Sequence, residues 1–154
     1  AAGFIQALED QIKAWHRSNE TSQRLAEIPG IGLMTATALA AAIGDARAFR
    51  NGRELAAWLG LVPQQASSGG RQRLLGISKR GDRYLRTLLI HGARAVVRHA
   101  RAAIEAGKPP KSPWLARLLG RRHPNVAAVA LANHNARVVW ALLTRQERYQ
   151  AHAT

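Results

Sequence analysis

Apolar residues recur at helical spacing along most of this chain. The first set, which predicts an amphipathic helix near the N-terminus, is Phe4, Ile5, Leu8, Ile12 and Trp15. An alanine- and leucine-rich run over 33–43 predicts another helix, which Gly44 is placed to end. Longer periodic stretches predict helices over about 82–105 and about 124–144. The pattern therefore predicts an all-α fold.

Helix boundaries are marked by polar caps, prolines and glycines. Asn51 is predicted to cap a helix that Gly60 ends. Ser112 followed by Pro113 is typical of an N-cap with proline at the first helical position. The stretch over 61–78 is the least helical part, because it is interrupted by proline and several glycines. We expect a central Gly-rich loop or short hairpin there.

The length of 154 residues suits one domain, or one domain with appended helices. A Gly-Lys-Pro-Pro stretch over 107–110 is the clearest linker. We therefore expect an N-terminal connecting helix over 1–22, a core over 23–106 and C-terminal helices over 107–154. The predicted core contains a helix-hairpin-helix element and the central loop.

Positive charge dominates the composition. Lysine and arginine number 23 against 9 aspartate and glutamate residues, which gives a formal net charge of +14. Such self-repulsion favours a polyanionic partner, with nucleic acid ahead of a membrane surface. The absence of cysteine excludes disulfides, thiolate metal sites and cysteine nucleophiles, and is compatible with a cytoplasmic location. We expect no membrane partner, because no apolar run approaches membrane-spanning length.

One face of the helix predicted over 82–105 carries arginines. At about 100° per residue, a stripe roughly 120° wide contains Arg83, Arg86, Arg94, Arg98 and Arg101. Apolar residues occupy the opposite side, where His99 is predicted to be a core residue. A solvated surface face is the alternative interpretation. Acids are almost absent from the stripe, so phosphate contact is favoured.

A Pro-Gly turn precedes the helix predicted over 33–43. Its sequence, Ile28-Pro29-Gly30-Ile31-Gly32, resembles the helix-hairpin-helix element of many DNA-binding proteins. Glycine lets a phosphate approach the backbone, and a helix N-terminus favours an anion. Gly30 and Gly32 are therefore candidate phosphate-binding positions, and Thr35 is close enough to add a hydroxyl. The alternative is a structural turn without a ligand.

Two hydroxyls, Ser67 and Ser68, lie on the central loop. The basic residues around them in the sequence are Arg71, Arg73, Lys79, Arg80, Arg83 and Arg86. This arrangement predicts either a serine nucleophile beside a phosphate-binding surface or a basic loop that only binds nucleic acid. Tyr84 is a candidate for stacking on a base. The acids are dispersed and the histidines lack a zinc or serine-histidine spacing, so the sequence indicates no metal site and no evident base.

Six short motifs follow one another in order. They are Ile28-Pro29-Gly30-Ile31-Gly32, Gly44-Asp45 with Phe49, Ala56-Ala57-Trp58-Leu59-Gly60-Leu61-Val62-Pro63, Ser67-Ser68-Gly69-Gly70, Gly76-Ile77-Ser78-Lys79-Arg80-Gly81-Asp82 and Leu85-Arg86-Thr87-Leu88-Leu89. This set resembles the C-terminal transposase domain of insertion-sequence transposases related to the Piv DNA invertase. The resemblance covers about residues 23 to 149. Members of that family carry an N-terminal RuvC-like domain with a DEDD carboxylate set.

The resemblance implies DNA transposition or site-specific recombination through a serine. Ser68 would attack the phosphodiester and form a phosphoserine-DNA intermediate, with Ser67 as the fallback. Mg²⁺ would be bound in the RuvC-like domain, which is missing from these residues, so no cofactor is expected in this fragment.

The resemblance also implies a guide (bridge) RNA and homodimers that assemble into tetramers. We expect this fragment of a longer protein to bind nucleic acid without recombining it. A non-catalytic helix-hairpin-helix module that binds DNA or RNA is the alternative.

Overall fold

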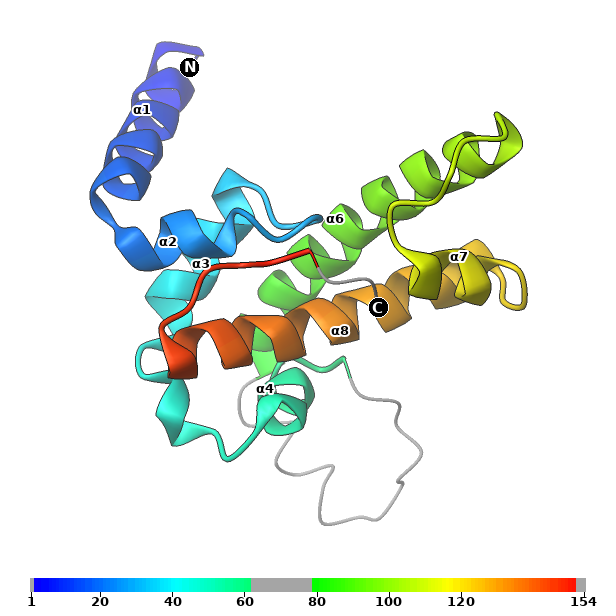
Figure 1. Cartoon of the computed structure of the whole chain (residues 1–154). Helices are drawn as coiled ribbons and strands as arrows, with labels where there is room; N and C mark the ends of the chain where they lie inside the picture. The colour runs from blue at the N-terminus through cyan, green and yellow to red at the C-terminus, as the bar shows by residue number, and fades with distance from the viewer. Residues whose placement is uncertain (1, 62–78, 152–154) are drawn as a thin grey trace.

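The computed structural model of this chain describes residues 2–61 and 79–151. Within these residues all regular elements are helical, which confirms the predicted all-α fold class. The elements are α1 (Ala2–Ser18), α2 (Glu20–Leu25), α3 (Leu33–Ile43), the 3-10 helix η1 (Ala46–Ala48), α4 (Gly52–Trp58), α6 (Lys79–Glu105), α7 (Pro113–Leu119) and α8 (Pro124–Arg145) (Figure 1).

Local capping residues set several of these boundaries as predicted. The side chain of Asn51 accepts a hydrogen bond from the backbone N–H of Glu54 at 2.9 Å, which caps α4. The side chain of Ser112 accepts one from the backbone N–H of Leu115 at 3.2 Å, which caps α7. Helix α3 ends at Gly44, whose φ of 64° lies in the region that favours glycine. Helix α6 begins at Lys79, slightly earlier than the predicted start.

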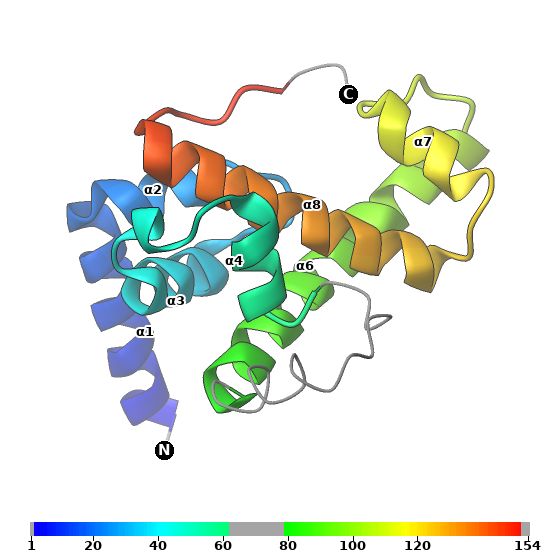
Figure 2. The ribbon, with the colours of Figure 1, turned by 90° about the horizontal axis from the view of Figure 1, so that it is seen from below.

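Helix α8 is the central packing element. Its most extensive contacts are with α6 and α4, and Figures 1 and 2 show α6 crossing it at an angle. Val139 of α8 belongs to the same buried cluster as Leu25, Leu55 and Leu89 from α2, α4 and α6. The C-terminal helices therefore share one hydrophobic core with the rest of the described chain. The boundaries proposed at 22/23 and 106/107 stay predictions about organisation along the sequence.

Helix α8 also corrects one expectation. It is long and apolar enough to cross a membrane by length and composition, whereas the sequence was expected to contain no such segment. In the fold, 44% of this apolar window is buried against the protein. The apolar character of α8 is explained by its position at the centre of the core.

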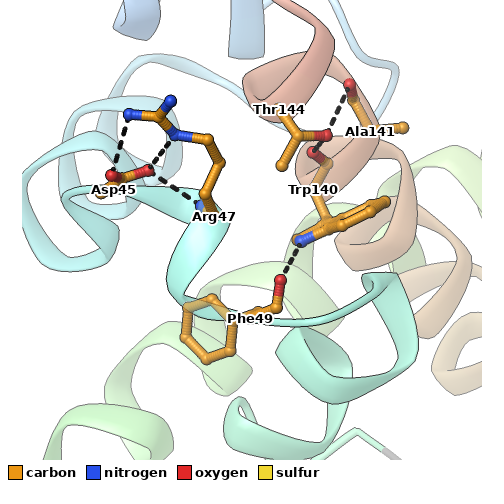
Figure 3. Close-up of polar contacts among 6 residues, drawn as sticks. All are labelled: Asp45, Arg47, Phe49, Trp140, Ala141 and Thr144. Carbon is orange, nitrogen blue, oxygen red and sulfur yellow. Dashed lines mark hydrogen bonds and ion pairs between the residues drawn. The ribbon is translucent and has the colours of Figure 1, made fainter.

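The connection between α3 and α4 is fixed at both ends. The Asp45 carboxylate accepts from the backbone N–H of Arg47 at 2.9 Å and pairs with its guanidinium at 3.1 Å (Figure 3). The indole N–H of Trp140 donates to the carbonyl oxygen of Phe49 at 3.0 Å. Within α8, the Thr144 hydroxyl donates to the Trp140 carbonyl oxygen at 2.8 Å. Helix α8 thus holds this connection against the core.

Helix α1 projects from one end of the molecule (Figure 1). It contacts α2 and α3, but none of its residues is buried. Phe4 is 69% exposed and Trp15 is 40% exposed. The predicted amphipathic helix is confirmed, while its apolar stripe lies outside the core formed by the described residues.

Candidate nucleic-acid interface

The central loop lies outside the described residues. The candidate nucleophiles and basic residues that fall there are Ser67, Ser68, Arg71 and Arg73. Lys79 and Arg80 form the beginning of α6, although the structure describes only their backbone. The described part of the site therefore consists of the two chain ends that flank this loop and the helix that follows it.

The chain entering the loop is held by two long-range contacts. The side-chain amide of Asn133, on α8, donates to the carbonyl oxygen of Leu61 at 3.2 Å. Gly60 precedes Leu61 with a φ of 74°, and a Cβ atom there would come within 2.7 Å of an Arg86 guanidinium nitrogen. Arg86 is half-buried and therefore lies against the end of α4. Both contacts fix where the chain leaves the core at residue 61.

The arginine stripe on α6 faces solvent except at its edge. Its exposed members are Arg83, Arg94, Arg98 and Arg101. On the opposite side, Leu85, Leu89 and Ala93 are buried in the core. Arg86 lies at the edge of the stripe and is turned towards Gly60. The helix therefore presents four exposed guanidinium side chains while its other side is fixed by packing.

Four acidic residues elsewhere in the described chain are paired with arginines. The ion pairs are Arg24 with Glu20, Arg47 with Asp45, Arg50 with Glu54 and Arg148 with Glu27. Hydrogen bonding to these arginines lowers the pKa of Glu27, Asp45 and Glu54 below the ordinary carboxyl range. None of the four pairs includes an arginine of the α6 stripe. The positive potential of the stripe is therefore left available for phosphate.

Tyr84 borders a surface cavity beside this stripe. The ring is 53% exposed. The cavity has a volume of about 350 Å³ and is lined by Gln11, Ile12, Trp15, Met34, Thr37, Ala38, Ala41 and Tyr84. Exposed aromatic rings are suitable surfaces for base stacking. The structure thus places Trp15 near Tyr84, a relationship between α1 and α6 that the sequence did not indicate.

The predicted hairpin turn packs closely against α6 and α8. Gly30 has a φ of 98° and its Cβ direction points at Asn135 and Gly92. The side-chain amide of Asn135 donates to the carbonyl oxygen of Pro29 at 3.0 Å. One side of the turn is therefore a packing joint in the interior of the fold.

The other side of the turn leads to the first residues of α3. Gly32 is the N-cap residue of α3, is exposed, and has no side chain to cap the helix. Thr35 is 6% exposed, so its side chain lies in the interior and we leave it out of the proposed interface. Among the predicted phosphate-binding positions in this region, Gly32 is the one that faces solvent.

Two histidines differ from what the sequence indicated. His99 was expected in the core but is exposed on α6, so that expectation was wrong. His134 received no role, yet its ring stacks on Trp114 with centroids 5.1 Å apart. Burial, followed by the nearby Arg137 charge, lowers the pKa of His134. The imidazole is therefore neutral near pH 7 and helps to join α7 to α8.

The sequence did not indicate the contacts of the two asparagines that flank His134. Asn133 and Asn135 project from different sides of α8, one to the end of α4 and the other to the hairpin turn. A polar amide at a buried helical position needs a hydrogen-bond partner. The sequence feature that could have indicated these contacts is the polar Asn-His-Asn triplet inside a largely apolar helix.

The described residues supply no candidate metal centre. Within 2–61 and 79–151, no three histidine, aspartate or glutamate side chains gather where they could hold an ion.

Comparison with known proteins supplies the family. A sequence model of the Transposase IS116/IS110/IS902 family matches residues 22–107, and no solved structure matches the chain. A probable family 20 transposase of Pseudomonas aeruginosa is 59% identical over 146 residues, covering 95% of this chain and 42% of that protein. The transposase for insertion sequence element IS1111A of Coxiella burnetii is 52% identical over 145 residues, covering 94% and 39%.

A shorter match extends the comparison to an inverting protein. The pilin gene-inverting protein of Moraxella bovis is 39% identical over 74 residues, covering 46% of this chain and 22% of that protein. This chain spans about two fifths of the length of the two transposases, 42% and 39%. The family match covers more than half of the chain and includes the Pro-Gly turn before α3, the central loop and all of α6. The chain belongs to the Transposase IS116/IS110/IS902 family.

Proposed function

We propose that this chain is the serine-bearing part of a longer enzyme that transposes or recombines DNA. Ser68 is the proposed nucleophile, and Ser67 is the fallback. The basic residues proposed to hold the scissile phosphate or its neighbours are Arg71, Arg73, Lys79, Arg80, Arg83 and Arg86. Family membership and relatives named as transposases and as a gene-inverting protein support this proposal.

The proposed chemistry conserves the number of phosphoester bonds. The Ser68 oxygen forms a bond to phosphorus while the bond to one deoxyribose oxygen breaks. The serine proton passes to a base, and the leaving sugar oxygen takes up a proton. The reverse attack by a sugar hydroxyl rejoins the strand and releases serine. Guanidinium groups stabilise the charge that develops on the phosphorus oxygens.

One observation carries the proposal: α6 follows the central loop in the sequence and bears exposed arginines that take part in none of the ion pairs of the described residues. Arg83 lies in the first turns of α6, and Arg94, Arg98 and Arg101 follow on the exposed side. The side chain of Arg86 lies against Gly60, which precedes the loop in the sequence. A strand bound along this helix would be held by the element that follows the Ser68 segment in the sequence.

The remaining parts are proposed to lie elsewhere in the enzyme. A RuvC-like domain would supply carboxylates that bind Mg²⁺, so the catalytic site would be shared between domains. A bridge RNA would select the DNA sites, and dimers would assemble into tetramers. This fragment alone is then expected to bind nucleic acid without exchanging strands. Strand exchange by the 154 residues with Mg²⁺ would contradict that expectation.

The test is covalent trapping with matched serine variants of the intact enzyme. Mass spectrometry should detect one protein-DNA adduct on element-end DNA with guide RNA, and its peptide should contain Ser68. Ser68→Ala should abolish both adduct and recombination, whereas Ser67→Ala should retain the adduct. Survival of adduct and recombination in Ser68→Ala would show that Ser68 is wrongly assigned. Loss in Ser67→Ala alone would move the role to Ser67.

A non-catalytic nucleic-acid-binding module is the second candidate. It is favoured by the exposed N-terminus of α3, where Gly32 provides no side-chain cap and leaves backbone amides available to a phosphate. Such a module binds DNA or RNA through phosphate contacts and forms no covalent bond. Repeated failure to trap an adduct with the intact enzyme, together with salt-dependent binding, would favour this candidate.

A further inference from the structure

A second group of exposed cations lies at the end of α6 away from the serine loop. We call this group, Lys108, Lys111, Arg117, Arg121 and Arg122, the distal basic end. All five belong to α7 or to its connections with α6 and α8. Figure 1 shows α7 beside the C-terminal end of α6, far along the helix from its start at Lys79. None of the five was a candidate in the sequence analysis.

The charge of the distal basic end is not balanced locally. The sequence contains no acidic residue between Glu105 and Glu147. The ion pairs of the described chain involve Arg24, Arg47, Arg50 and Arg148, and none includes a member of the distal basic end. Five exposed cations beside the single carboxylate of Glu105 form a surface that favours a polyanion.

The backbone that carries these cations is fixed by hydrogen bonds. Beyond α6, the Lys108 N–H donates to the carbonyl oxygen of Ala103 at 2.9 Å. Beyond α7, the N–H groups of Arg121 and Arg122 both donate to the carbonyl oxygen of Leu118, at 3.1 and 2.9 Å. A fixed backbone reduces the ordering cost of binding, because only the side chains remain to be immobilised.

Helix α7 itself is anchored to the core. Leu115 is 3% exposed, and Trp114 stacks on His134 of α8. The distal basic end is therefore part of the folded body of the protein, and its position relative to α6 is set by packing.

Helix α6 runs from its first turns, where Arg83 lies, to the connection that carries Lys108. Helix α6 has 27 residues. At about 1.5 Å per residue this is roughly 40 Å, which corresponds to about 12 base pairs at about 3.4 Å each. The stripe arginines Arg94, Arg98 and Arg101 lie in this interval. We propose that the distal basic end binds the phosphate backbone of duplex DNA about one helical turn from the part of that duplex held at the first turns of α6, where Arg83 lies.

This inference rests on the proposed recombinase function, because that function supplies the DNA. Duplex DNA is the partner that the observations favour. Its phosphates repeat along a stiff rod, and the stripe arginines are distributed along the rigid helix α6. Structured RNA is an alternative polyanion that the experiment distinguishes.

The experiment measures binding of the 154-residue chain to duplexes of increasing length by fluorescence anisotropy. The test variant is Arg117→Gln with Arg121→Gln and Arg122→Gln. The control, Lys13→Gln with Arg17→Gln and Arg145→Gln, removes three exposed charges from other parts of the surface. Both variants have the same net charge, so a difference between them reports position. Circular dichroism checks that both keep the wild-type helical content.

We expect wild-type affinity to rise when the duplex is lengthened from about 10 to about 24 base pairs. The test variant should lose most of this rise, and its slope of log K against log salt should decrease by about 2 to 3 if each arginine contacts one phosphate. The control should retain most of the length dependence.

Three outcomes would overturn the proposal. They are an equal loss of length dependence in both variants, an unchanged length dependence in the test variant, and no DNA binding by any of the proteins. Stronger binding of a base-paired RNA of equal length, lost only in the test variant, would overturn its assignment to DNA. Ser68→Ala should leave the length dependence unchanged. An error in the proposed nucleophile is therefore distinguishable from an error about this surface.

Discussion

The carbonyl oxygen of Gly30 lies where a side chain on Gly92 would begin. An ideal Cβ atom on Gly92 would overlap this oxygen, and the carbonyl carbon of Gly30 would be 3.0 Å away. The hairpin turn before α3 therefore approaches α6 backbone to backbone. Glycine at position 92 permits the contact because it has no Cβ atom. This joint sets the position of the hairpin turn relative to the arginine stripe.

Gly92→Ala should destabilise the protein. The added methyl group cannot fit unless the turn or α6 moves, and overpacking of this kind costs about 1–3 kcal/mol or more. The measurement is the free energy of unfolding in urea. Gly3→Ala is the matched control, because its Cβ direction meets nothing within 4 Å. If Gly92→Ala is as stable as Gly3→Ala, the close approach is absent in solution.

Asn135→Ala should also lower the stability, and by more than Asn133→Ala. Asn135 is 3% exposed, and its amide donates to the Pro29 carbonyl oxygen at 3.0 Å. Loss of a buried hydrogen-bond partner costs about 1–3 kcal/mol. Asn133 is only half-buried, so solvent can replace part of its bond to Leu61. Thermal unfolding of the two variants provides the comparison, and equal losses would contradict it.

Arg94→Gln with Arg98→Gln should weaken DNA binding and its dependence on salt. Each lost phosphate contact decreases the slope of log K against log salt by about 0.9 on duplex DNA. The matched control is Arg17→Gln with Arg145→Gln, which removes two exposed charges outside the stripe. Titrations at several salt concentrations measure the slope. A control that loses as much slope as the stripe variant would indicate that only net charge matters.

The stability of the protein should decrease as the pH falls below about 6.5, in part because of His134. Burial and the Arg137 charge lower the pKa of His134 in the folded state, so the unfolded chain binds its proton more readily. Above the unfolded pKa, about 6.5, this contribution to stability is fully present. It is lost progressively as the pH falls from there towards the lower folded pKa.

The test is unfolding of wild type and His134→Phe between about pH 5 and pH 7. Phenylalanine keeps an aromatic ring beside Trp114 but cannot take up a proton. The variant should therefore show a smaller change in unfolding free energy over this interval. The same pH dependence in both proteins would exclude His134 as a contributor.

The sequence by itself determined the helices and many of their ends. Gly44, Asn51 and Ser112 act within a few residues of a helix terminus, so their effects are visible without a fold. The periodicity of α6 likewise separated Leu85 and Leu89 from the exposed arginines, because one helix face must be buried. The composition predicted a basic surface. The order of the short motifs along the sequence indicated the family.

Only the tertiary structure decided which helix faces are covered. His99 lies near the C-terminal end of α6, where Ile104 is also 44% exposed, so helical phase alone misplaced it in the core. The contacts of Gly30 with Gly92 and of Asn133 with Leu61 join residues far apart in the chain. Such contacts depend on how helices cross, and helix crossing is set by the packing of all their side chains together. The local sequence pattern therefore determined the helices, while side-chain packing determined the contacts between them.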